Sequence, residues 1–175
     1  EPVVLLAHPD KYLLEEARRT VHIDVEPLPA VFTIEDSLAK RAIVWGQDNV
    51  LKSYHVDKGD VESAWAGADV IVEGEYSTSW QEHAYLQPEA GLGYIDDEGR
   101  VTVVIAGQWA HEDQEQIYHA LNLDPEQVRV IYPAIGGAFG GREDMSLQIV
   151  LALAAWKLRR PVKAQWSREE SIRYH

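Results

Sequence analysis

The spacing of hydrophobic residues along the chain predicts a mixture of strands and helices. Val21, Ile23 and Val25 alternate with polar residues, which is the pattern of a half-buried strand. The apolar run from Met145 to Leu158 is long enough for a buried helix. We expect strands at residues 3–7, 21–26, 42–45, 50–56, 70–79, 90–95, 100–106, 127–132 and 162–166, and helices or helical turns at 10–20, 33–40, 61–66, 112–121 and 145–158. The fold class that we expect is α+β, with largely antiparallel sheets and packed helices.

Turn and capping residues mark several of the boundaries between these elements. Residues 96–99 end in glycine between two strand patterns, which predicts a β-hairpin. Asp60 can cap the helix that follows it, and Gly67 can close that helix. Ser167 and Glu170 have the spacing of a capping box, so a further helix is expected to begin there. A helix that begins so close to the end of the chain suggests a fragment of a larger protein.

Composition and charge restrict the classes of partner. The chain has 175 residues, with 16 basic and 29 acidic residues and a net charge of −13. Such a charge argues against a nucleic-acid partner, because no basic surface is available to displace counterions from phosphates. No apolar run reaches membrane-spanning length, so we expect no membrane partner. Cysteine is absent, which excludes disulfides, thiolate zinc sites and iron–sulfur ligation within this chain and is compatible with a cytoplasmic location.

The glycine-rich stretch from Gly136 to Glu143 is the strongest candidate for chemistry. Glycine allows main chain to approach a ligand closely, and a helix start after the loop would add free N–H groups, so we predict a site for an anionic or oxo-bearing ligand. A phosphate-binding P-loop does not fit, because Arg142 and Glu143 stand where Lys and Ser or Thr are needed. The dinucleotide fingerprint is absent as well. The alternative is a glycine turn that only lets a helix pack tightly.

Two other groups of polar residues carry weaker signals. Gln108 follows a predicted strand and precedes a helix, where a neutral amide could both donate and accept, although from the residue alone a surface glutamine that caps the helix is the favoured interpretation. His111 and His119 lie in a polar helical stretch that begins like a zinc motif, but its last position is Glu115. We interpret this stretch as a solvated helix face and predict no metal ligands in the chain.

Several stretches together resemble the molybdenum hydroxylases, the xanthine dehydrogenase and aldehyde oxidase family. The loop Gly136 to Glu143 is similar to the family's G-G-x-F-G-G-K/R-E, and Gln108 stands where the family has an active-site glutamine. The segments 81–86 and 150–163 are similar to the family's Q-E-H-x-Y-L and A-L-A-A-x-K-x-x-R-P-V-K, and 26–31 resembles the E-P-L-P-A-V that ends the preceding domain. The chain departs from the pattern at Gln87, where many members have glutamate near the proline, and at Arg142, where others have lysine.

The resemblance implies a function, a cofactor and a set of site residues. Such enzymes bind molybdenum through molybdopterin and hydroxylate an aldehyde or a purine-like heterocycle with oxygen from water. The implied catalytic residues are Gln108 and Glu143, and the implied cofactor-binding residues are Gln108, Gly137, Phe139, Gly140, Gly141 and Arg142. Gln108 would hydrogen-bond an oxo group, and Glu143 would face the substrate.

The resemblance also implies how the chain is organised and what surrounds it. Residues 1–40 would be the end of a preceding hammerhead-like α/β domain, and residues 41–175 the start of the molybdopterin-binding domain. Iron–sulfur clusters and possible FAD would lie on other domains or subunits, and a homo-oligomer is possible. The fragment alone would be inactive, because the general base would lie downstream. Two alternatives stay open, a non-catalytic binding or assembly module and, more weakly, a metal-binding domain that uses His111 and His119.

Overall fold

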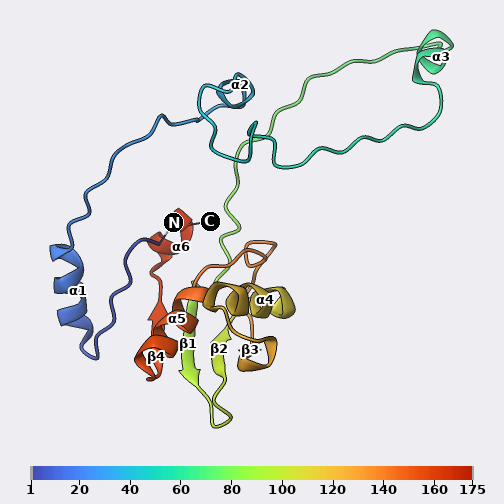
Figure 1. The fold of residues 1–175 in the computed structure, drawn as a ribbon. Coiled ribbons are helices and arrows are strands. Elements are labelled where there is room, and N and C mark those ends of the chain that lie inside the picture. The colour runs from blue at the N-terminus through green and yellow to red at the C-terminus, as the bar shows by residue number, and fades with distance from the viewer. Residues whose placement is uncertain (1, 175) are drawn as a thin grey trace. The chain divides into compact units, whose positions relative to one another are not determined.

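The computed structural model describes residues 2–174, so Glu1 and His175, at the outer ends of the two predicted domains, lie outside the described residues. The chain divides into two compact units, one formed by residues 2–20 with 79–174 and the other by Val21–Thr78. The first of these, called the sheet unit below, contains all the predicted site residues. Figure 1 shows the elements of both units along the chain.

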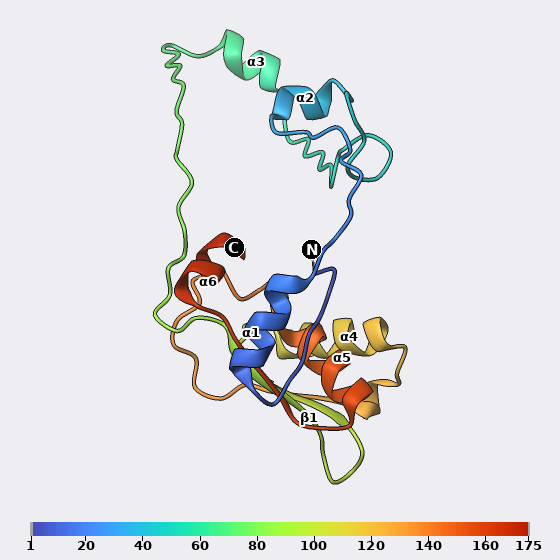
Figure 2. The same ribbon diagram turned by 90° about the vertical axis from the view of Figure 1, so that its left-hand side faces the viewer.

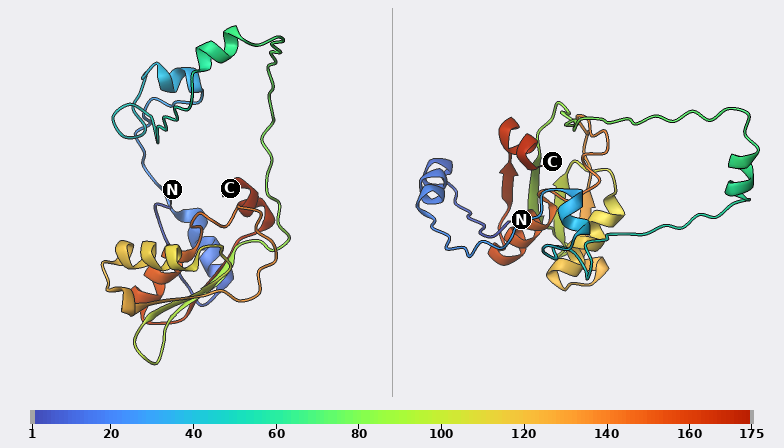
Figure 3. Two further views of the ribbon diagram at one scale, coloured as in Figure 1. Left: turned by 90° about the vertical axis from the view of Figure 1, so that its right-hand side faces the viewer. Right: turned by 90° about the horizontal axis from the view of Figure 1, so that it is seen from above.

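A four-stranded mixed sheet forms the centre of the sheet unit. Its strands are β1 (Ala90–Ile95), β2 (Val101–Ile105), β3 (Val128–Ile131) and β4 (Val162–Gln165), in the order β3-β2-β1-β4. β1 pairs antiparallel with β2 and β4, whereas β2 and β3 are parallel. The predicted hairpin is confirmed, and its turn closes with a 3.0 Å hydrogen bond from the Asp96 N–H to the Arg100 carbonyl. This turn extends beyond the helices (Figure 3). The expected α+β class with mostly antiparallel pairing is therefore confirmed.

Two helices cover one face of the sheet. α4 (Ala110–Leu121) connects the parallel strands β2 and β3, and α5 (Gln148–Leu158) packs on β1, β2 and α4 (Figure 2). The buried core comprises Val101, Val103, Ile105, Ile117, Leu121, Val128, Leu147, Leu151 and Ala152. α5 lies very close to β1, because a Cβ added at Gly93 would be 2.5 Å from the main-chain oxygen of Leu151. Glycine in β1 thus permits the contact between helix and sheet.

The remaining helices are short and follow their capping signals. They are α1 (Lys11–Thr20), α2 (Ile34–Leu38), α3 (Val61–Ala66), the 3₁₀ helix η1 (Pro125–Gln127) and α6 (Arg168–Tyr174). Asp60 caps α3 by accepting a 3.0 Å hydrogen bond from the Ser63 N–H. The capping box at α6 forms as predicted, since the Ser167 N–H donates to Glu170 and the Glu170 N–H donates to the Ser167 hydroxyl. No helix within residues 2–174 combines the length and apolar character needed to cross a membrane.

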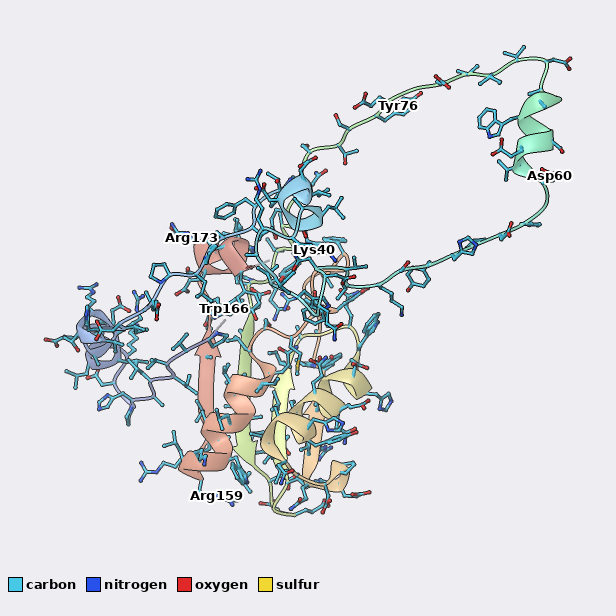
Figure 4. The ribbon with its side chains drawn as sticks, turned by 45° about the horizontal axis from the view of Figure 1, so that its top comes forward. Lys40, Asp60, Tyr76, Arg159, Trp166 and Arg173 are labelled. Carbon is cyan, nitrogen blue, oxygen red and sulfur yellow. The ribbon has the colours of Figure 1, made fainter. Side chains whose placement is uncertain are left out.

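Five of the expected strands are absent from the structure. Residues 3–7, 21–26, 42–45, 50–56 and 70–79 form no strand, and Val72 and Tyr76 are 86% and 92% exposed. Figure 4 shows Tyr76 on a long extended segment of the second unit. A strand exists only through its hydrogen bonds to a neighbouring strand, and within residues 2–174 no strand pairs with any of these five segments. The sequence pattern was sufficient to predict an extended conformation but not pairing.

The position of α5 also differs from the prediction. The expected helix began at residue 145, shortly after the glycine loop, whereas α5 begins at Gln148 and residues 142–147 are not helical. Leu147 is the N-cap and makes no side-chain capping hydrogen bond. The expected helix terminus is therefore not part of the glycine loop, and any anion-binding N–H groups must come from the loop itself.

Candidate functional site

The glycine loop, defined here as residues 136–142, follows β3 and is built from unusual backbone angles. Gly137 and Gly140 have φ angles of +101° and +91°, and Phe139 has a φ of +56°. Glycine adopts such angles without a steric penalty, whereas Phe139 requires local support. Hydrogen bonds close the loop on itself, from the Gly141 N–H to the Ala138 carbonyl at 2.9 Å and from the Glu143 N–H to the Gly140 carbonyl at 3.3 Å. The Phe139 side chain is 76% exposed at the tip of the loop.

Gln108 lies directly against this loop. Its side-chain oxygen accepts hydrogen bonds from the main-chain N–H groups of Gly140, at 3.1 Å, and Arg142, at 3.2 Å. Its own N–H donates to the Arg142 carbonyl at 3.1 Å. Because both partners of the side chain are donors, the atom that faces them must be the oxygen. The Gln108 amide nitrogen therefore faces away from these two donors and has no hydrogen-bond partner among the described residues.

The loop offers further unused donors beside Gln108. The main-chain N–H groups of Gly137, Ala138 and Phe139 have no hydrogen-bond partner within residues 2–174. Consecutive N–H groups in a tight turn form a concave site that favours anions and oxo groups. Together with the Gln108 amide nitrogen, these groups form a neutral set of donors.

The segment that precedes β1 supports the loop from behind. Gln87 and Gly136 bond to each other twice, through the Gly136 N–H and the Gln87 side-chain oxygen at 2.8 Å and through the Gln87 N–H and the Gly136 carbonyl at 3.3 Å. A Cβ added at Gly141 would lie 2.9 Å from both the His83 and Tyr85 rings. Gln87, a departure from the family pattern, thus has a clear role in holding the loop.

Arg142 is a buried cation behind the loop. Its side chain is 3% exposed, its Nε donates to the Gly137 carbonyl at 3.0 Å, and its Nη2 donates to the Gln87 carbonyl. Nη1 lies 3.7 Å from a carboxylate oxygen of Glu89, and the guanidinium stacks 4.1 Å from the centre of the Tyr85 ring. The positive charge of Arg142 is therefore used inside the protein.

Glu89 and Tyr85 form the acidic side of this buried cluster. The Tyr85 hydroxyl donates to Glu89, and both side chains are almost fully buried. Burial alone would raise the pKa of Glu89, but hydrogen bonds from Tyr85 and Ser171 and the charge of Arg142 bring it below its usual value. Burial and the neighbouring carboxylate raise the pKa of Tyr85, so its hydroxyl stays protonated. Glu89 is therefore a carboxylate that balances Arg142.

A second buried carboxylate lies behind Gln108. Asp113 is 1% exposed and accepts hydrogen bonds from the Tyr132 hydroxyl at 2.6 Å and the Gln148 amide at 3.1 Å. Burial raises the pKa of Asp113, while these two hydrogen bonds oppose the rise. Gly107 packs against Tyr132 so closely that a side chain there would clash with the hydroxyl. The Asp113 network thus supports the turn that carries Gln108.

The predicted solvated helix face is therefore only partly right. His111, Glu115 and His119 are exposed as expected, but Asp113 is buried. Asp113, Ile117 and Leu121 are spaced four residues apart and share the buried face of α4, a signal that was available in the sequence. Glu89, by contrast, carries no pattern that would have distinguished it from a surface residue.

Glu143 follows the loop with its side chain half-buried. No ion pair or hydrogen bond to its carboxylate is present in the described part of the chain. The structure brings together all the predicted site residues on the glycine loop, at Glu143 directly after it, and on the adjacent turn that carries Gln108.

Within residues 2–174, no three His, Cys, Asp or Glu side chains come close enough to hold a metal ion. An open cavity of about 370 Å³ lies instead between α4 and β3, lined by His111, Gln114 and Arg129 among others.

The chain belongs to the molybdopterin cofactor-binding domain family, whose model matches residues 45–175. It is 38% identical over 170 residues to the nicotinate dehydrogenase large molybdopterin subunit of Eubacterium barkeri, a match that covers 97% of this chain and 40% of the relative. It is 31% identical to the putative xanthine dehydrogenase molybdenum-binding subunit of Escherichia coli, with 97% of this chain and 23% of the relative covered.

The chain is also similar to a solved structure. The aldehyde oxidoreductase of Desulfovibrio gigas superposes with a TM-score of 0.83 and 26% identity over 94% of this chain and 18% of that chain. The chain thus spans about two fifths or less of the length of these relatives. The resemblance to the molybdenum hydroxylases that the glycine loop and Gln108 indicated is confirmed at the level of the family.

The donors around the loop fit a molybdopterin cofactor in chemical character. The cofactor has anionic and oxo groups, and the site presents neutral N–H donors at Gln108 and residues 137–139. The loop has no Cβ at Gly136, Gly137, Gly140 or Gly141, so main chain can come close to a ligand.

Proposed function

We propose that the chain is the part of a molybdenum hydroxylase subunit that holds the molybdopterin cofactor and one side of the substrate site. The observation that carries this proposal is the bonding of Gln108 to the glycine loop, which turns its amide nitrogen away from the loop donors. The bound cofactor would supply the oxidation of an aldehyde or purine-like heterocycle with oxygen from water. The relatives named as nicotinate and xanthine dehydrogenase subunits and as an aldehyde oxidoreductase support this class of substrate.

Each site residue then has a role that follows from its position. Gln108 would donate a hydrogen bond to an oxo group of the bound cofactor, and its neutral amide can do so without adding a charge. The main chain of Gly137, Phe139, Gly140 and Gly141 lines the cofactor, with the N–H groups at 137–139 as free donors. Arg142 takes part through the main-chain N–H that fixes Gln108, while its side chain points into the protein.

Glu143 is proposed to face the substrate. Its carboxylate is adjacent to the loop and free of other partners in the described chain, so it can accept a hydrogen bond from a nitrogen heterocycle or share a proton with it. The exposed Phe139 ring at the loop tip can form an apolar wall of the same site. Both residues act on the substrate side, while Gln108 acts on the cofactor side.

We further propose the organisation around the chain. Residues 1–40 would end a preceding hammerhead-like domain and residues 41–175 would begin the molybdopterin-binding domain, which a family match from residue 45 supports. Iron–sulfur and flavin groups would lie on other domains or subunits, consistent with relatives that are named as subunits. A cytoplasmic location and a homo-oligomer remain predictions, and we expect the chain by itself to bind cofactor poorly and to be inactive.

The proposal is tested with Gln108→Glu, Gln108→Ala and Glu143→Ala in the full-length subunit. Gln108→Glu keeps an oxygen for the Gly140 and Arg142 donors but replaces the outward NH₂ by a second oxygen. We expect hydroxylation to fall on the order of 100-fold or more, as for the loss of a donor at a reacting site, while folding is unchanged. Glu143→Ala should leave molybdenum content intact and reduce turnover. Wild-type activity in all three variants would favour a non-catalytic binding or assembly module that kept the loop for packing.

A further inference from the structure

The side chain of Arg142 touches two separate segments of the chain. It bonds the Gly137 carbonyl within the glycine loop and the Gln87 carbonyl in the segment before β1. The same guanidinium lies 3.7 Å from the Glu89 carboxylate and stacks on the Tyr85 ring. Tyr85 and Glu89 are buried, as is the Arg142 side chain, whereas Phe139 in the same loop is 76% exposed.

The main chain of Arg142 reaches a third segment. Its N–H donates to the Gln108 side-chain oxygen, and its carbonyl accepts from the Gln108 N–H. One residue therefore links the segment before β1, the glycine loop and the turn after β2. The orientation of the Gln108 amide depends directly on where the Arg142 main chain lies.

We propose that Arg142 is the positioning residue of the site, and that its buried guanidinium sets the conformation of the glycine loop and the orientation of the Gln108 amide. This goes beyond a contact with the cofactor, because the side chain is 3% exposed and faces the protein interior. Only the expected effect of Arg142 on molybdenum content rests on the proposed function. The order of the loop itself can be measured whether or not the loop binds a cofactor.

The chemistry of the guanidinium explains why this position suits arginine. Its planar fork donates to the two carbonyls of Gly137 and Gln87 from different nitrogens while its face covers the Tyr85 ring. A lysine ammonium is a single point charge and cannot make both bonds and the stacking contact together. Arg142→Lys therefore keeps the charge that balances Glu89 but loses the geometry.

Glu89 is fixed independently of Arg142. It accepts a hydrogen bond from Tyr85 and interacts with Ser171 of α6, and its carbonyl accepts a 2.8 Å bond from the Trp166 N–H (Figure 4 labels Trp166 after β4). The counter-charge is thus held by the sheet and by α6 rather than by the loop. The sheet therefore holds Glu89 in place. Glu89 and Tyr85 in turn position the Arg142 side chain, which positions the loop.

The experiment compares Arg142→Met, Arg142→Lys and Glu89→Gln with wild type in the full-length subunit. Hydrogen exchange of peptides from residues 136–143 measures the order of the loop, and molybdenum per subunit measures its consequence. Removing one partner of a buried charge pair leaves the other uncompensated, so we expect loop exchange to rise at least about tenfold in Arg142→Met and Glu89→Gln. Arg142→Lys should fall between Arg142→Met and wild type, and molybdenum content should follow the same order.

The matched control is Arg100→Met. Arg100 also bonds a carboxylate, Asp96 at 2.8 Å, but lies in the β1–β2 turn and touches none of the loop residues. It should change exchange in the hairpin and leave residues 136–143 as in wild type. Wild-type loop exchange in Arg142→Lys or Arg142→Met overturns the proposal, as does an equal rise across β1 and β2, which would indicate only a general loss of stability. If Arg142→Met does not fold, Arg142→Lys and Glu89→Gln decide, since both keep most of the side-chain volume.

If loop exchange rises selectively but molybdenum content does not change in any variant, the positioning role stands and the proposed function fails. The two conclusions can therefore be separated in one set of proteins.

Discussion

Replacing Gly137 by alanine is expected to destabilise the sheet unit much more than the same change at Gly99. Both glycines have positive φ angles, +101° and +81°, so alanine is strained at either position by about 1–2 kcal/mol. At Gly99 an added Cβ would have no atom within 4 Å, whereas at Gly137 it would lie 2.9 Å from the Tyr85 Cβ. Overpacking of this kind adds about 1–3 kcal/mol. We therefore expect about 2–5 kcal/mol for Gly137→Ala and about 1–2 kcal/mol for Gly99→Ala.

The assay is a urea titration in which pulsed hydrogen exchange of β1 and β2 peptides measures the unfolded fraction at each urea concentration. Peptides from these two strands report on the unfolding of the sheet unit alone. Gly99→Ala serves as the control for backbone strain without a clash. The difference between the two variants isolates the contact of the loop with Tyr85. Equal losses of unfolding free energy would show that the loop can move away from Tyr85 freely, and would refute the conclusion that the segment before β1 holds it.

Three further predictions follow from buried or capping side chains. Asp113→Asn should be as stable as wild type or up to about 1 kcal/mol more stable at neutral pH, because it removes a buried charge and keeps an acceptor for Tyr132. The folded-state pKa of Asp113 is raised, so wild type loses stability as the pH rises above about 4. The stability advantage of Asp113→Asn, measured by urea titration, should therefore grow over that range. The folded-state pKa of Glu89 is lowered, so its carboxylate contributes to the unfolding free energy above about pH 4.3, and this contribution is lost as the pH falls through the folded-state pKa. The difference in unfolding free energy between wild type and Glu89→Gln should shrink over that range. Asp60→Ala should cost α3 about 1 kcal/mol and raise amide exchange at Ser63, and unchanged exchange there would mean that the cap is not needed.

The sequence was most informative where both partners of a contact lie close together along the chain. The β1–β2 hairpin and the caps of α3 and α6 were predicted correctly, because each depends on residues a few positions apart. Residues 70–79 have a strand pattern, but pairing depends on a neighbour that the described residues do not supply, so no strand formed. The pattern of one segment cannot specify the partner.

The candidate site shows the same division. The glycine loop and Gln108 could be found from residue types and from family resemblance, and the structure places them in contact. The contacts behind them could not all be found in this way. Family resemblance pointed to Arg142 as a cofactor-binding residue, but nothing in the sequence indicated that its side chain is buried beside Glu89, and only the fold brings the two together in the interior.

The left-handed backbone at Phe139 restricts which variants the loop can accept. Phe139 is 76% exposed, so packing of the fold does not fix the size or polarity of this side chain, but a φ of +56° is costly for valine, isoleucine and threonine. Asparagine and glycine tolerate this angle best. A library that seeks new substrate preferences at position 139 should therefore omit β-branched residues, and diversity can be concentrated at the loop tip while the interior scaffold is left as it is.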